Sequence, residues 1–88
     1  MSVSAAQIEA ALSAALQPAS LEVQDDSQLH AGHAGAREGR HFSVRVVSAR
    51  FNGLSRLARH RLVYDSLNSL MQRGIHALAI DARAPGES

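Results

Sequence analysis

The N-terminal part of the chain shows the hydrophobic spacing of an amphipathic helix. Its apolar side chains recur three and four residues apart, on one helical face. They are Ile8, Ala11, Leu12, Ala15 and Leu16. Ser4 and Gln7 have the spacing of a capping box, and Pro18 cannot continue the helix. The pattern therefore predicts a helix over residues 5–17.

Three later segments alternate apolar and polar residues, which is the period of a half-buried strand. Leu21 and Val23 predict a short strand over residues 21–24. Residues 41–48 read HFSVRVVS and form the clearest strand. Residues 76–84 alternate around Leu78 and Ile80, and Pro85 ends this third strand.

A second helix is expected between the last two strands. Residues 51–53 form a turn, after which Ser55 can cap the helix. Its apolar positions include Val63, Leu67, Leu70 and Met71. Gly74 suits a left-handed C-terminal cap.

This order of elements predicts an α+β domain in which helices cover one face of a three-stranded sheet. The 88 residues are enough for one core, so residues 1–88 are expected to form a single domain. The chain has no cysteine, which excludes thiol chemistry and cysteine-ligated metal. It also lacks the motifs of common enzymes and any long apolar run, so we expect a soluble, cytoplasmic, non-enzymatic protein.

Arginines are concentrated in one part of the chain. Residues 37–61 hold seven arginines and one acid, although the net charge of the whole chain is only +1. Four of these arginines flank the turn into the second helix, where they could contact phosphates: Arg50, Arg56, Arg59 and Arg61. A solvated helix face is the alternative interpretation.

Histidines are the other candidate functional groups. His30 and His33 lie in a long loop over residues 26–40, and neutral imidazoles are common ligands of transition metals. Two solvated loop histidines are the simpler interpretation. His76 has the parity of Leu78 and Ile80, so it is either a core histidine at the end of the sheet or a ligand held on a rigid strand. His41 is expected to pack or hydrogen-bond, and His60 to be solvated.

Three segments together resemble the BolA family along nearly the whole chain. They read DDSQLHAGH, HFSVRVVSARFNGLSRLARHRLVYDSL and GIHALAIDARAP. The family signature is matched by Phe51 and Gly53 in the turn, then by the RHR triplet at residues 59–61 and the HAL strand at residues 76–78. The resemblance implies an αββααβ fold like class II KH domains, with a short helical turn followed by a longer helix within residues 55–73.

The resemblance also implies partners and a cofactor. BolA-like proteins pair with monothiol glutaredoxins and share a two-iron two-sulfur cluster, to which the glutaredoxin contributes a cysteine and glutathione. The ligands on this chain correspond to His76 and to His30, with His33 as the rival of His30. The expected function is iron regulation or cluster delivery. The alternative is DNA-binding transcription regulation through the arginines, although the GxxG loop of KH domains is absent.

Overall fold

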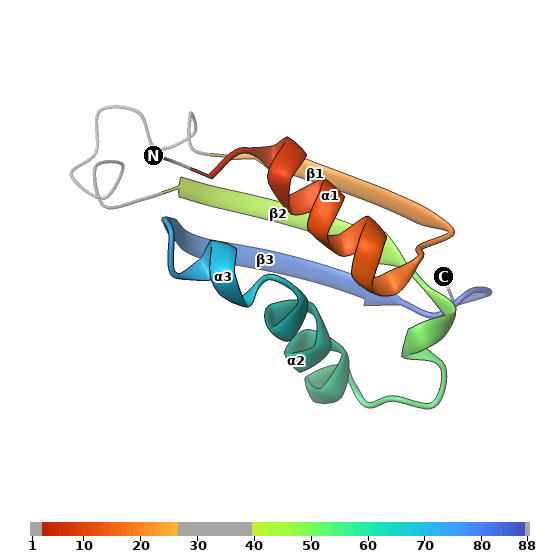
Figure 1. The fold of residues 1–88 in the computed structure, drawn as a ribbon. Helices are drawn as coiled ribbons and strands as arrows, with labels where there is room; N and C mark the ends of the chain where they lie inside the picture. The colour runs from red at the N-terminus through yellow and green to blue at the C-terminus, as the bar shows by residue number, and fades with distance from the viewer. Residues whose placement is uncertain (1–2, 27–39, 88) are drawn as a thin grey trace.

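The computed structural model describes residues 3–26 and 40–87. The elements follow the order αββααβ, as expected, with one additional 3₁₀ helix. They are α1 (Ala5–Leu16), β1 (Ser20–Asp25), β2 (Arg40–Val47), η3 (Ala49–Phe51), α2 (Arg56–Ser66), α3 (Asn68–Met71) and β3 (Ile75–Arg83). Figure 1 shows the three α-helices on the same face of the sheet, which confirms the predicted α+β architecture.

The sheet is mixed and has the strand order β1-β2-β3. β1 pairs antiparallel with β2, whereas β2 pairs parallel with β3. A parallel pair needs a crossover connection, and η3, α2 and α3 provide it. The starts of β2 and β3 consequently lie at the same end of the sheet (Figure 1).

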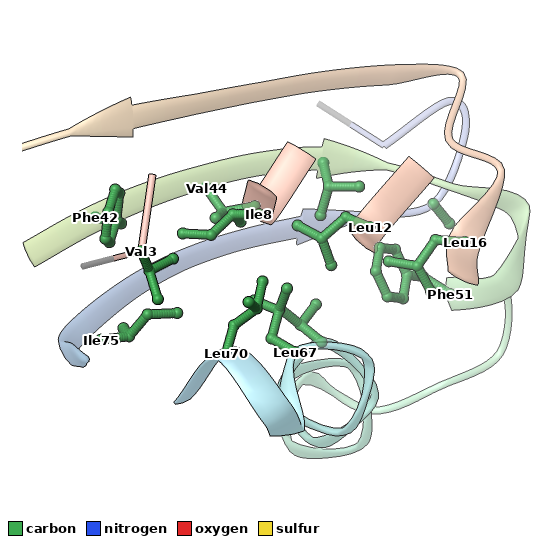
Figure 2. Packing of buried hydrophobic residues seen from close by; sticks show 13 residues of the cluster. Val3, Ile8, Leu12, Leu16, Phe42, Val44, Phe51, Leu67, Leu70 and Ile75 are labelled. Atoms are coloured by element: carbon green, nitrogen blue, oxygen red, sulfur yellow. The ribbon is translucent and has the colours of Figure 1, made fainter. Parts of the chain in front are cut away.

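The core lies between the sheet and the helices. The predicted stripe of α1 is confirmed, because Ile8, Leu12 and Leu16 are buried in one cluster with residues of the sheet such as Val44. The cap of α1 is also as expected, since Ser4 and Gln7 form a capping box. Figure 2 shows Val3 and Ile75 at the end of the cluster near Phe42, Leu70 beside Leu67 near its middle, and Leu16 with Phe51 at the other end.

The second helical region differs from the expected order. The long helix α2 comes first and the short α3 follows it, and the short turn that precedes them is η3, which lies before Ser55. Ser55 does cap α2, because its hydroxyl accepts a hydrogen bond from the backbone N–H of Ala58. Gly74 has a φ of +145°, outside the left-handed helical region, and α3 already ends at Met71. Gly74 is therefore a turn residue before β3 and not a helix cap.

Ser48 joins three elements in the interior. Its side chain is fully buried, and its hydroxyl donates a 2.7 Å hydrogen bond to the carbonyl of Leu16 at the end of α1. The same hydroxyl accepts from the N–H of Arg50 in η3, and the Ser48 N–H donates to the carbonyl of Arg83 on β3. One small polar residue thus satisfies backbone groups of the helix, the 3₁₀ turn and, through its own amide, the edge strand.

Replacing Ser48 with alanine should lower the free energy of unfolding by about 1–3 kcal/mol, because it leaves buried backbone groups without their partner. Urea denaturation of wild type and variant measures the difference. Ser13→Ala, at an exposed position of α1, is the matched control and should change stability by less than about 0.5 kcal/mol. Equal stability of Ser48→Ala and Ser13→Ala would contradict this role.

Candidate functional site

Two histidines meet at the end of the sheet where β2 and β3 begin. His41 is the second residue of β2 and His76 is the second residue of β3. Their ring centroids lie 5.2 Å apart, with 45° between the ring planes. We call these two residues the histidine pair.

A shift in the strand register determines how His76 is presented. Arg40 pairs with Ile75 and His41 pairs with Ala77, so β2 has no residue opposite His76. Ile75 is buried in the core, whereas His76 is exposed. Regular alternation from Leu78 would bury His76 and expose Ile75. Because His76 is exposed, the interpretation of His76 as a core histidine is wrong. Bulges of this kind change the direction of a side chain at functional sites.

His30 and His33 lie outside the described residues, as do residues 27–39 of the predicted loop. The described residue that precedes this segment is held beside the histidine pair. The N–H of Asp26 donates a 2.7 Å hydrogen bond to the carbonyl of His41, and the hydroxyl of Ser43 donates to the Asp26 carboxylate. The end of β1 is thus anchored next to the start of β2.

The histidine pair is not a closed metal site. Within residues 3–26 and 40–87, the structure contains no group of three or more histidines or carboxylates positioned to hold a metal ion. A closed zinc site takes four ligands. A metal held by these two residues would therefore need further ligands from elsewhere. His60 does not belong to the pair, because it lines a groove between α2 and the C-terminal half of β3.

Arg59, one of the candidate phosphate-binding residues, holds the C-terminal segment in place. Its guanidinium donates two hydrogen bonds to the Glu87 carboxylate, at 2.5 and 2.8 Å. It also donates to the carbonyls of Leu54 and Ala82. The side chain is only 14% exposed, so Arg59 acts as an intramolecular clamp.

The clamp has an electrostatic signature. The hydrogen bonds from Arg59, together with one from the N–H of Ala84, lower the pKa of Glu87 to about 2. The same contact with Glu87 raises the pKa of Arg59. The sequence did not mark this role, because residue 87 lies 28 positions from Arg59 and follows the last strand.

Two further arginines, both on strands, are engaged in ion pairs. Arg83 donates a 2.8 Å hydrogen bond to Asp81, and this contact lowers the pKa of the Asp81 carboxyl. Arg45 lies between two carboxylates, with its guanidinium nitrogens 3.8 Å from an oxygen of Glu22 and 3.9 Å from an oxygen of Asp81. Part of the arginine excess is therefore neutralised within the fold.

The other three candidate arginines, Arg50, Arg56 and Arg61, are exposed. Two large apolar side chains of α2 are exposed as well, Leu57 at 61% and Tyr64 at 40%. Leu57, Arg61 and Tyr64 have the spacing of one helical face. That face of α2 is therefore both basic and apolar.

Comparisons with known proteins place the chain among BolA-like sequences. The family model described as BolA-like protein matches residues 12–87. SufE-like protein 1 of Arabidopsis thaliana is 47% identical over 82% of this chain and 21% of its own length. The DNA-binding transcriptional regulator BolA of Escherichia coli is 45% identical over 84% of this chain and 69% of its own.

The fold is similar to solved structures over the whole chain. BolA1 from Arabidopsis thaliana superposes with a TM-score of 0.84 and 39% identity, covering 100% of this chain and 98% of the other.

The chain spans less than two thirds of the length of several curated relatives, such as 48% of the chloroplastic protein BOLA1 of Arabidopsis thaliana. Among the helices within the described ranges, none is long and apolar enough to cross a membrane.

The Arg59 clamp should make stability depend on pH through Glu87. A lowered carboxyl pKa stabilises the folded state above the ordinary value of 4.5, and this contribution is lost as the pH falls through about 2. Glu87→Gln should therefore be less stable than wild type at neutral pH, and the difference should shrink below pH 4.5. Urea denaturation across this range measures it.

Glu9→Gln removes a carboxylate from an exposed position of α1 and is the control for a change in net charge. A constant difference between Glu87→Gln and wild type at every pH would show that the Glu87 carboxylate does not act through its charge.

Proposed function

The chain belongs to the BolA-like protein family, and on that basis we propose that it is a non-enzymatic adaptor that pairs with a monothiol glutaredoxin and co-ligates a two-iron two-sulfur cluster. Its role would be iron regulation or cluster delivery. Relatives include a protein named for chloroplasts and mitochondria, so a cytoplasmic location stays a prediction.

The observation that carries the proposal is the exposed imidazole of His76. It lies at the start of a strand, beside a register shift, and next to a second imidazole. A ligand on a strand is held more rigidly than one on a loop. Because His76 is exposed, a second protein can approach it without any rearrangement of the core.

The chemistry of the donors supports a shared cluster. This chain has no cysteine, so every protein sulfur ligand must come from the partner, and glutathione can complete the partner's side. When bound, the cluster would supply a redox centre with imidazole on one iron and thiolate on the other, and imidazole ligation raises the reduction potential. His76 would hold the cluster on this chain, with His30, or its rival His33, as second ligand.

Binding of DNA is the second candidate function, and two observations favour it. A relative at 45% identity is named as a DNA-binding transcriptional regulator, and Arg50, Arg56 and Arg61 are exposed. Arg59 is engaged with Glu87 and would contribute little. The exposed Leu57 and Tyr64 on the same helix suit a protein surface better than a phosphate backbone, which favours the first proposal.

Mixing this chain with a monothiol glutaredoxin, glutathione, iron and sulfide should give a visible absorption and circular dichroism spectrum different from that of the glutaredoxin homodimer. His76→Ala should remove the difference, because it deletes the ligand that the strand holds. His60→Ala, which removes a histidine from the groove beside α2, is the matched control and should leave the spectrum unchanged.

The second ligand is tested in the same reaction. His30→Ala should change the spectrum more than His33→Ala. If the spectrum survives His76→Ala combined with His30→Ala, the cluster proposal is wrong.

For the DNA proposal, affinity should fall with salt, and each phosphate contact adds about 0.9 to the slope of log K against log salt. Replacing Arg56 and Arg61 together with alanine should therefore reduce the slope by up to about 2. Arg59→Ala should not reduce it in this way, because its guanidinium is bound to Glu87. Gel-shift titrations on promoter and scrambled DNA measure both quantities, and equal affinity for the two DNAs would contradict specific regulation.

A further inference from the structure

We propose that His41 and His76 form a two-imidazole site that binds one divalent transition-metal ion on the isolated chain. This site does not need a glutaredoxin, and it uses His41, which the cluster proposal does not. The ion would be one that prefers nitrogen ligands, such as Cu²⁺, Ni²⁺ or Zn²⁺, rather than Mg²⁺ or Ca²⁺.

The distance between the rings fits a shared ion. A metal bound to two imidazoles at about 2.0–2.1 Å, with tetrahedral angles, holds the ring centroids about 5 Å apart. The observed separation of the His41 and His76 centroids is 5.2 Å. The rings are tilted by 45° and do not form a parallel face-to-face stack.

The fold holds the backbones of the two histidines independently of any ligand. His41 is fixed within the β-ladder by its pairing with Ala77, and its carbonyl accepts the N–H of Asp26. Next to His41, Phe42 is buried in the core, as is Ile75 next to His76. The backbones on both sides of the pair are therefore positioned before metal arrives, which lowers the entropic cost of binding.

The pair leaves coordination positions open. Within the described ranges, the histidine pair is not part of a larger group of metal ligands, and His76 is exposed to water. Water or a ligand from another molecule would complete the coordination. We therefore infer an exchangeable site of moderate affinity, and not a structural metal on which folding depends.

Copper broadening in nuclear magnetic resonance spectra tests the site on the intact chain. Substoichiometric Cu²⁺ added to the metal-free protein at neutral pH should broaden the ring signals of His41 and His76 together, before those of His60. The chain needs no substitution for this measurement. Broadening of His30 and His33 first, with the histidine pair unaffected, would overturn the proposal.

Calorimetric titration with Ni²⁺ gives the second test. Removing a residue that only orients a metal ligand lowers metal affinity by about 10–100-fold. Removing a ligand itself should cost at least as much, so His76→Ala and His41→Gln should each weaken Ni²⁺ binding by at least about tenfold. His60→Ala and the double variant His30→Ala with His33→Ala are the controls and should retain wild-type affinity. His76 is exposed, so its substitution leaves the core intact.

Unchanged affinity in His76→Ala would refute the site, whatever the behaviour of His41→Gln. The cluster proposal is judged separately, because its spectrum requires glutaredoxin and glutathione while this titration contains neither. A chain that binds Ni²⁺ but forms no mixed cluster supports only the present inference, and the reverse outcome supports only the proposed function.

Discussion

The register shift at the start of β3 is the constraint on which the candidate site depends. It allows Ile75 to fill the core beside Phe42 and leaves its neighbour His76 exposed. Without the shift, unbroken alternation from Leu78 would turn Ile75 out of the core and turn the imidazole into it. Parallel pairing then brings His76 to the same sheet end as His41. The packing of the core and the presentation of the histidines are therefore consequences of one backbone feature.

A second constraint divides the arginines into two groups. Arg59 spans α2, β3 and the C-terminal segment through Glu87, and it belongs to the fold. Its neighbour Arg61 on the same helix is exposed, close to Leu57 and Tyr64 at helical spacing. The same RHR triplet thus contributes one structural residue and one surface residue. On α2, a DNA or protein partner would therefore contact Arg61 rather than Arg59.

The two proposals for the histidines differ in what completes the coordination. In the adaptor proposal, His76 and a histidine of the loop would hold one iron of a cluster whose other iron is held by thiolates of the partner and glutathione. In the metal proposal, His41 and His76 hold one ion with water. Both depend on the same exposed imidazole, and an ion on the pair would compete with a cluster for His76. Both proposals are compatible with the described residues, because two imidazoles would leave coordination positions of a metal unfilled.

The sequence by itself determined the element order, the apolar stripe of α1, the caps at Ser4 and Ser55, and the family. These depend on local spacing and on motifs that lie close together in the chain. It did not reveal the exposure of His76, because counting parity from Leu78 assumes an unbroken ladder and the shift arises from pairing with β2. The approach of His41 to His76 and the clamp of Arg59 on Glu87 were equally hidden. Both join residues far apart in the sequence. The parallel pairing of β2 with β3 brings the two histidines together, and the packing of α2 against β3 brings Arg59 to Glu87.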